Sequence, residues 1–443
     1  MSLVPPPRRR WRRQLRSGRG PSLWGALASG SALLSSVLGS VAPSDAASGI
    51  SRDPLPTWGT NPAEDERAGR VLAMVEVGGV VYIAGEFTGL LPPETAPGAL
   101  VPRGYLAAID AATGQLTDWN PVADGPVRAL ALSEDGKLLY LGGDFDFVGG
   151  EQRRNLAAID LASGTVTPLF QPGSLDNVRS IAISGERLYA GGDFESVTGP
   201  AGRQDEGTHD RPQLAAFEAS TGTLVDWQPP SNRGGQFVGQ TGEHDGGGAN
   251  GVVYSIAVSP DGDQVFASGT FLDFGGQSGV LALDGRTGDA SDWQVGLDID
   301  RPVFDLDLSP SGDVLYMATG GAGGRLYAFE PDGSTDELWR VKVDGDCVGV
   351  AASETTVYLM GHYDFIVDPE SGCYRRCPEG LSRRHLAAFD ALTGEVDPWD
   401  PRANTSTGPY VAAVGEGHLY VGGEFTEING RPQPGFAQFP GKP

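Results

Sequence analysis

Four carboxylates recur at one position of a repeated motif in which Ala-Gly or Gly-Gly precedes an acid and a phenylalanine. They are Glu86, Asp144, Asp193 and Glu424. Carboxylate oxygens are preferred ligands of Ca²⁺, so a ring of these acids would make a cation site. A residue that returns in each repeat also commonly stabilises the repeat itself, by fixing a turn or bonding the next unit. We therefore predict no cofactor for this chain and keep Ca²⁺ at the four acids as an alternative.

Histidines supply the second set of candidates. Two of them precede an aspartate in acidic, glycine-rich loops, and a His-Asp pair can bind a metal or act as a base. Solvated loop histidines are also common, so both interpretations stay open. No HExxH, GxSxG or P-loop pattern is present, and the catalytic residues, if any, are unknown. The candidate ligand-binding residues are His209, Asp210, His244, Asp245, His362 and His385.

The three cysteines, Cys347, Cys373 and Cys377, are candidates for one disulfide. Their odd number leaves one cysteine without a partner. The spacing is also compatible with zinc binding. An exported chain meets an oxidising compartment, which favours a disulfide. The sequence leaves open which two cysteines are bonded.

Residues 1–46 have the order of an export signal. A basic region at Arg8–Gly20 precedes an apolar stretch at Leu23–Ala42, and small residues suited to cleavage follow. Arg12 and Arg13 resemble a twin-arginine signal, and the general secretion route stays open, as does an uncleaved anchor. No later stretch reaches the ~18 apolar residues of a membrane span. The sequence thus predicts a secreted protein, extracellular or periplasmic, with no membrane span after cleavage.

Charge limits the partners that this protein can bind. The 443 residues carry a net charge of −25, and because residues 1–46 hold seven arginines and one aspartate, the remainder carries about −31. Such a chain repels phosphate backbones and anionic lipids, so we expect no nucleic-acid partner. The partner is predicted to be an unknown protein or carbohydrate, and the protein itself a monomer.

A short apolar strand with a central aromatic residue occurs seven times. Each unit carries four strand signals, a Ser-x-x-Gly turn often follows the first, and no long amphipathic helix separates them. In the turn Ser133–Gly136, glycine is expected at a positive φ. Units of this kind cannot bury their apolar faces alone. The anchoring aromatics are Tyr82, Tyr140, Tyr189, Phe266, Tyr316, Tyr358 and Tyr420.

Four short strands per unit, repeated radially, are typical of a β-propeller. We predict an all-β, seven-bladed β-propeller with four-stranded blades over residues 47–443. Its last unit lacks a fourth strand, and Leu55–Trp58 supplies an orphan one, so the N-terminal strand should close the ring on the last blade. An open array is the alternative. The predicted blades lie near 70–119, 126–170, 177–227, 251–293, 302–340, 346–399 and 410–439 plus 54–59.

Two units in particular, Tyr140–Gly164 and Tyr420–Phe439, resemble the delta-60 repeats of secreted bacterial β-propeller proteins, and the resemblance extends over about 54–440. It implies a fold and export. The family has no generally assigned reaction, so the resemblance implies no catalytic residue. The fifth unit departs from the motif at Gly320 and Gly321, and the sixth has His362 and Tyr363 where the acid and phenylalanine would stand.

Long insertions identify the face that should bind a ligand. In a four-stranded blade, the connections from strand two to three and from one blade to the next share one face, and all four insertions fall there. Long loops on a rigid scaffold commonly carry binding sites. We predict a binding or interaction module of unknown ligand that acts through this long-loop face. The alternatives are a secreted enzyme, either a polysaccharide hydrolase or lyase or a quinone-dependent dehydrogenase, and a structural envelope protein. The insertions are 88–104, 195–212, 229–250 and 364–384.

Overall fold

A computed structural model of the chain describes residues 49–441, apart from 62–68, 94–97, 174, 199–206, 231–237, 240–251, 270, 273–278, 292, 294–300, 322, 332–335 and 406. The predicted export signal at 1–46 lies outside the described residues. Within them the chain forms β-strands and no α-helix, which confirms the all-β part of the prediction. Accordingly, the described part contains no helix of the length and apolarity that a bilayer crossing requires.

Seven antiparallel sheets, called here the main sheets, follow one another along the described chain. The first three are β2 (Arg70–Val77), β3 (Val80–Glu86) and β6 (Leu106–Asp110); β7 (Val127–Leu132), β8 (Leu138–Gly143), β11 (Leu156–Asp160) and β12 (Thr165–Val166); and β13 (Val178–Ser184), β14 (Arg187–Gly192) and β17 (Leu214–Glu218). The fourth and fifth are β19 (Val253–Val258), β20 (Gln264–Gly269) and β22 (Val280–Asp284); and β23 (Val303–Leu308), β24 (Leu315–Thr319), β25 (Arg325–Phe329) and β26 (Glu337–Val343). The sixth and seventh are β27 (Asp346–Ala352), β28 (Thr356–His362) and β31 (Leu386–Asp390); and β32 (Pro409–Gly415), β33 (His418–Gly423) and β36 (Phe436–Pro440).

Short strands extend the connections between the second and third strands of the main sheets. Five of these connections hold a pair of short strands, and we call them the extension hairpins. They are β4 (Gly89–Leu91) with β5 (Val101–Pro102), β9 (Phe147–Val148) with β10 (Glu151–Gln152), β15 (Ser196–Thr198) with β16 (Thr208–Asp210), β29 (Phe365–Val367) with β30 (Leu381–Ser382), and β34 (Glu427–Ile428) with β35 (Arg431–Pro432). The other short strands are β1 (Gly59–Thr60), β18 (Val238–Gly239) and β21 (Phe271–Leu272).

The core consists of apolar layers between successive main sheets rather than one central mass. Central strands such as β8 read as continuous apolar runs because neighbouring sheets cover both of their faces. Tyr140 of the second sheet, for example, packs with Leu188 and Phe217 of the third. One layer joins the last sheet to the first, where Tyr420 and Phe436 meet Val71. Every main sheet therefore depends on its neighbours for burial.

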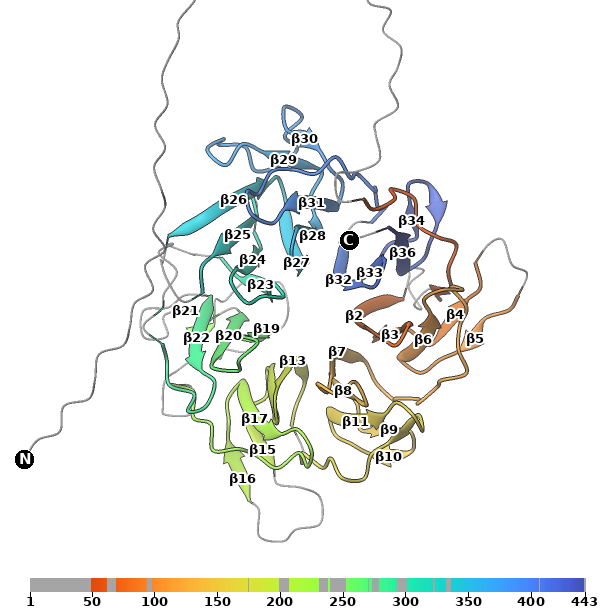
Figure 1. Cartoon of the computed structure of the whole chain (residues 1–443), viewed down its shortest axis with the longest axis vertical. Coiled ribbons are helices and arrows are strands. Elements are labelled where there is room, and N and C mark those ends of the chain that lie inside the picture. The colour runs from red at the N-terminus through yellow and green to blue at the C-terminus, as the bar shows by residue number, and fades with distance from the viewer. Residues whose placement is uncertain are drawn as a thin grey trace, which may run out of the picture. The chain divides into compact units, whose positions relative to one another are not determined.

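The first strands of the main sheets lie nearest the common centre around which Figure 1 shows the sheets arranged. Each of these inner strands contacts the next one, in the order β2, β7, β13, β19, β23, β27 and β32, and β32 contacts β2. The turn after β7 contains Gly136 at φ 66°, as the sequence predicts. The same left-handed glycine follows β19 and β23, at Gly262 and Gly312.

The N-terminal segment pairs with the last main sheet, but over a shorter length than the sequence predicts. Leu55 forms an antiparallel bridge with Gln438 of β36. Gly59 and Thr60 pair instead with β4. Beyond Leu55 the side-chain amide of Gln433 donates to the carbonyl of Phe436 at 2.9 Å and to the hydroxyl of Thr57 at 2.7 Å, so a side chain takes the place of the next ladder bond.

Four-stranded blades are also only partly present. In the described residues of the first, third, fourth and sixth sheets, the predicted fourth strand is reduced to one bridge, such as Ile109 with Leu116. Side chains near the tryptophans accept the backbone N–H groups that a ladder would use. Asp397, for example, accepts the N–H of Trp399 at 2.7 Å. Such local bonds compete with strand pairing.

The pairing of the N-terminal segment yields a test of ring closure. Deleting residues 47–60 should lower the melting temperature or cause aggregation, because it exposes the edge of β36 and removes the contacts of Leu55. Thermal unfolding and size-exclusion chromatography would measure this. The variant Arg431→Ala is the matched control, since it loses only the exposed ion pair with Asp53, worth at most about 1 kcal/mol. A deletion variant as stable and monomeric as the control would contradict closure.

Candidate functional site

Three of the four recurring acids lie beside arginines of the inner strands. Glu86 contacts Arg70 at 3.4 Å and Arg128 at 3.1 Å. Glu424, which is almost fully buried, accepts a bond from Arg70 at 2.8 Å. Asp193 contacts Arg179 at 3.3 Å. Guanidinium groups therefore compensate these carboxylates in the place where a bound cation would have to sit.

Arg70 is the centre of this network. Burial opposes its charge, but Tyr410, Glu424 and Glu86 act in the other direction, and the net effect raises the pKa of Arg70. Tyr410 also donates a hydrogen bond to Glu424 at 3.1 Å. The fourth acid, Asp144, is exposed. The ring of acids is thus an uneven ion-pair network rather than a set of equivalent ligands.

Every inner strand contains a β-bulge near its start, after the first paired residue in five strands and after the second in β2 and β27. In β7, for instance, Val127 pairs with Gly143 and Ala129 with Gly142, and Arg128 is left between them. Bulges re-aim side chains and occur frequently beside functional sites. The residues at the seven bulges are Leu72, Arg128, Arg179, Tyr254, Phe304, Val348 and Tyr410, and each is partly exposed.

All seven bulge residues line one cavity of about 390 Å³ at the centre of the main sheets. Along its wall, the cationic side chains of Arg128 and Arg179 are followed by the aromatic side chains of Tyr254 and Phe304. Arg179 lies over the ring of Tyr254, with 5.7 Å from its guanidinium carbon to the ring centroid. Tyr254 in turn contacts Phe304, with ring centroids 5.5 Å apart. This cavity, which we call the central cavity, can offer a ligand both charge and flat apolar surface.

Two half-buried carboxylates, Asp305 and Asp307, also line the central cavity. Asp305 accepts the N–H of Val350 at 2.9 Å and Asp307 accepts that of Ala352 at 2.8 Å, so both join β23 to β27. Burial raises the pKa of Asp305 to about 6 and that of Asp307 to about 7, although the backbone bonds act in the opposite direction. The hydrogen bonds between the fifth and sixth main sheets therefore involve two carboxyl groups whose pKa values are raised toward neutral pH.

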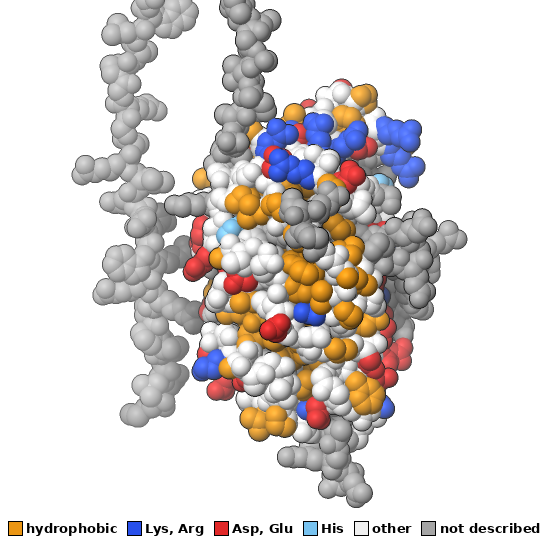
Figure 2. All heavy atoms as spheres, turned by 90° about the vertical axis from the view of Figure 1, so that its right-hand side faces the viewer, with side chains coloured by type: hydrophobic (Ala, Val, Ile, Leu, Met, Phe, Trp, Pro, Cys, Tyr) orange, Lys and Arg blue, Asp and Glu red, His pale blue; other side chains and the backbone are white. Residues whose placement is uncertain are grey.

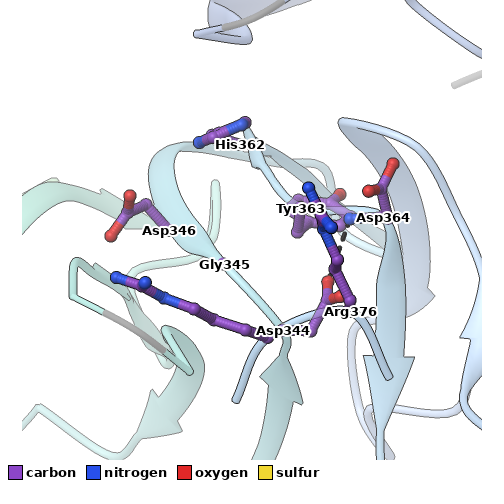
Figure 3. A pocket seen from close by; sticks show the side chains of 8 residues that line it. Asp344, Gly345, Asp346, His362, Tyr363, Asp364 and Arg376 are labelled. Carbon is purple, nitrogen blue, oxygen red and sulfur yellow. Dashed lines mark hydrogen bonds between the residues drawn. The ribbon is translucent and has the colours of Figure 1, made fainter. Parts of the chain in front are cut away.

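A second and larger pocket, of about 620 Å³, lies between the fifth and sixth main sheets at the end of the sheets that carries the extension hairpins. His362 and Asp346 line it from β28 and β27, and Arg376 lines it from the insertion 364–384. Figure 3 shows Asp346 on one side of this pocket and Arg376 with Asp364 on the other, with His362 above them. We call it the sheet 5–6 pocket.

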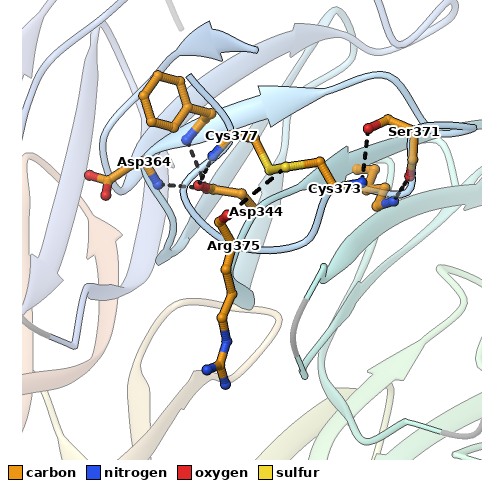
Figure 4. The surroundings of a disulfide bond; sticks show 8 residues. Asp344, Asp364, Ser371, Cys373, Arg375 and Cys377 are labelled. Carbon is orange, nitrogen blue, oxygen red and sulfur yellow. Dashed lines mark hydrogen bonds between the residues drawn. A yellow bond between two sulfur atoms is a disulfide. The ribbon is translucent and has the colours of Figure 1, made fainter. Parts of the chain in front are cut away.

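A disulfide between Cys373 and Cys377 closes the loop that supplies arginines to the sheet 5–6 pocket. Cys347 is a free, buried thiol, and burial raises its pKa well above the ordinary value. Figure 4 shows that Asp344 holds this loop in place. Its carboxylate accepts the N–H groups of Asp364 and Phe365, both at 2.9 Å, and that of Cys377 at 3.3 Å. Glu379 lies near the two sulfurs, but a disulfide offers no thiolate ligand to zinc.

The structure separates the predicted histidines. His209 and Asp210 lie exposed on β16, in an extension hairpin, and His244 and Asp245 lie outside the described residues. His385 is buried and occupies the left-handed position before β31, with φ 68°. Burial lowers its pKa. Of the predicted histidines that the structure describes, His362 lines the sheet 5–6 pocket, and its ring stacks on that of His385 with 6.0 Å between the centroids.

A repeated amide or carboxylate that sequence reasoning missed positions four of the extension hairpins. Asp124, for example, accepts the N–H groups of Asp146 and Phe147, both at 2.9 Å. Asn61, Asp344 and Asn404 make the same pair of bonds in the first, sixth and seventh units. The spacing from these residues to the following inner strand varies, so no fixed motif reveals them.

Basic side chains are unevenly distributed over this acidic protein. Figure 2 shows them gathered near the top of its face, the end at which Figure 1 places β29 and β30, while acidic side chains are scattered below. Arg375, Arg376 and Arg384 are exposed residues of the insertion 364–384 that contains these two strands. The protein has a net charge of −25, so this exposed cluster of arginines is a local region of positive charge on an acidic chain.

Comparison with known proteins gives limited information. No protein-family model matches the chain, and no curated protein matches it. Among solved structures, the crystal structure of the computationally designed Ika8 protein is similar, with a TM-score of 0.47 and 12% sequence identity, over 88% of this chain and 100% of that one.

The ion-pair network predicts how calcium affects stability. At matched ionic strength, Ca²⁺ should raise the melting temperature no more than NaCl does, because arginines already neutralise Glu86, Asp193 and Glu424. Any salt should stabilise in a graded way by screening the acidic surface. Thermal melts with and without Ca²⁺ test this. A large calcium-specific rise that is lost in Asp144→Asn plus Asp193→Asn would show that the acids bind metal.

The two cavity aspartates predict a pH effect on stability. Their folded pKa values lie above the unfolded value, so their contribution is complete below about pH 4 and is lost as the pH rises through about 6 to 7. Urea unfolding between pH 4 and 8 should therefore show a smaller loss of stability in Asp307→Asn than in the parent, by no more than about 4 kcal/mol. The exposed Asp146→Asn is the control. Parallel curves for all three proteins would refute the buried-acid interpretation.

Proposed function

We propose that this chain is a secreted, seven-bladed β-propeller that works as a binding module and holds its ligand in the central cavity, entered from the long-loop face. The cyclic order of contacts among the inner strands supports a closed ring. So does the bond from Gln438 of the last sheet to the carbonyl of Ala111 beside the first, at 2.7 Å. The disulfide between Cys373 and Cys377 is compatible with an oxidising compartment and hence with secretion.

The observation that carries the binding proposal is the ring of bulge residues. Seven successive sheets each direct one irregular residue into the same cavity, which regular strands would not do. The bulges place two arginines, two tyrosines and a phenylalanine, all partly exposed, around the cavity. These residues are typical of binding hot spots.

A carbohydrate is the ligand class that suits the central cavity best. Flat aromatic side chains such as Tyr254 and Phe304 can stack on the apolar face of a sugar, and Arg128 and Arg179 can donate to its hydroxyl oxygens. The volume of about 390 Å³ lies within the range of small-molecule sites. Acidic residues elsewhere on the surface repel competing polyanions.

An enzymatic function is a weaker candidate. Hydrolysis of a glycosidic bond uses a general acid and a second carboxylate that approach the substrate directly. Here Glu86 and Glu424 both face Arg70, and Asp193 faces Arg179, so ion pairs hold these carboxylates as counter-ions. His209 lies on β16 and His362 on β28, and they do not share a pocket among the described residues. Asp305 and Asp307 line the central cavity, but both carboxylates accept backbone N–H groups of β27 and so serve to join two sheets.

A panel of neutral and acidic oligosaccharides of defined composition, followed by thermal shift and isothermal titration calorimetry, tests the proposal. At about 100-fold excess over its Kd, a bound sugar should stabilise the protein by roughly 2–3 kcal/mol. Tyr254→Ala combined with Phe304→Ala should abolish the effect, because both stacking surfaces are lost.

Phe147→Ala provides the matched control, because this phenylalanine is 44% exposed on an extension hairpin and does not line the central cavity. The control should retain full binding. Equal binding by the double variant and the control would rule out the central cavity as the site. Failure of every oligosaccharide to stabilise the parent would remove carbohydrate as its ligand.

A further inference from the structure

The sheet 5–6 pocket lies where the sequence repeat breaks. In the first, second, third and seventh units an acid and a phenylalanine follow the second strand. The fifth unit has Gly320 and Gly321 there, with β24 and β25 joined directly, and the sixth has His362 and Tyr363. Because the fifth unit has no extension hairpin in this connection, the loop of the sixth unit reaches over it. A side chain at Gly323 would contact Tyr374 at 3.3 Å.

The loop that borders the pocket is built to present arginine. The disulfide between Cys373 and Cys377 leaves only Tyr374, Arg375 and Arg376 between the two cysteines. Arg376 has a φ of 48°, in the left-handed region that non-glycine residues adopt at a cost. Backbone strain that the surrounding structure maintains is frequent at ligand sites. Three backbone bonds to Asp344 and one disulfide hold the loop in this conformation.

The charges that face the pocket leave two guanidinium groups available. Among the described residues, the side chains of Arg375 and Arg376 make no hydrogen bond or ion pair, whereas Asp344 is satisfied by backbone N–H groups. Asp364 lies 3.5 Å from Arg384 and is thereby partly compensated. Asp346, on the opposite side of the pocket in Figure 3, is the remaining carboxylate.

Arginine binds planar oxyanions by two parallel hydrogen bonds and loses little entropy in doing so. A carboxylate such as Asp346 accepts hydrogen bonds from hydroxyl groups, and the imidazole of His362 can donate or accept one. The ligand that satisfies both sides carries an oxyanion at one end and hydroxyl groups at the other. A volume of about 620 Å³ accommodates a short oligosaccharide.

We propose that the sheet 5–6 pocket is a second binding site, for an acidic oligosaccharide whose carboxylate or sulfate groups pair separately with Arg375 and Arg376 while its hydroxyl groups face Asp346 and His362. The disulfide-closed loop determines the specificity of this site for anions. The site shares no residue with the central cavity, so each of the two proposals can fail while the other stands.

Calorimetry with four probes tests the site: a galacturonic acid trisaccharide, a sulfated trisaccharide, a neutral trisaccharide and inorganic phosphate. One of the two acidic saccharides should bind, with an affinity that falls as NaCl rises, and the neutral sugar should bind much more weakly. Arg375→Ala with Arg376→Ala should weaken binding about 10- to 100-fold. Which acidic sugar binds better identifies the oxyanion.

Arg154→Ala with Arg431→Ala changes the net charge equally, at two exposed arginines away from the pocket, and should keep full affinity. Cys373→Ser with Cys377→Ser should weaken binding, because the loop loses its constraint, and should also lower the melting temperature, because Cys377 is buried. Tyr254→Ala with Phe304→Ala should have no effect on this site. The proposal is wrong if neither acidic sugar binds, if the neutral sugar or phosphate binds equally well, or if both arginine pairs have the same effect.

Discussion

Hydrogen bonds from one main sheet to a backbone carbonyl of the next hold this structure together. Tyr140 donates to the carbonyl of Ala219 at 2.9 Å, and Tyr189 donates to that of Gly285 at 2.7 Å. Tryptophans at the outer edge do the same, as when Trp227 donates to Asp284 at 3.0 Å. A buried hydroxyl or indole N–H without a partner would be costly, so these bonds favour the correct register between the sheets that they join. The tyrosines and tryptophans that make them are therefore structural and are not surfaces for stacking sugars.

This inter-sheet bonding explains where variation is tolerated. The aromatic contacts lie in the middle and outer parts of the sheets. The bulged starts of the inner strands contact their neighbours through other and more varied interactions, such as the ion pair of Arg128 with Glu86 and the ring contact of Tyr254 with Phe304. Residues at those places differ from unit to unit: arginine, tyrosine, phenylalanine, valine and leucine occupy equivalent bulges. The packing between sheets thus repeats from unit to unit, whereas the side chains at the bulged end of the sheets differ. Repeat proteins commonly use such variable positions on a repeated scaffold for binding.

The sequence predicted the repeated units and the face that carries the long loops. Apart from His362, it did not predict which residues line the two cavities. The recurring tyrosine and Gly-Gly-acid-Phe motif revealed the units because those residues face equivalent neighbours. The extent of strand pairing was predicted less well, since the side chain of Gln433 and those near the tryptophans limit the ladders. The bulges could not be foreseen, because an inserted residue such as Arg128 looks in sequence like an ordinary member of an alternating strand. Pairing of Arg70 with both Glu86 and Glu424 joins the two ends of the chain, and no local pattern encodes it.

The N-terminal segment bonds to residues near the C-terminus, so these contacts can form only after synthesis of the chain is nearly complete. Asn429 binds the carbonyl of Arg52 across 377 positions of sequence, and Trp399 donates to the carbonyl of Ser51 across 348. At ~5–20 residues per second, the segment leaves the ribosome roughly 20 to 75 s before its partners exist. During that interval the earlier sheets can stack on one another, but the two ends of the stack remain uncovered. The chain must therefore stay unaggregated as an open arc until its final strands are made.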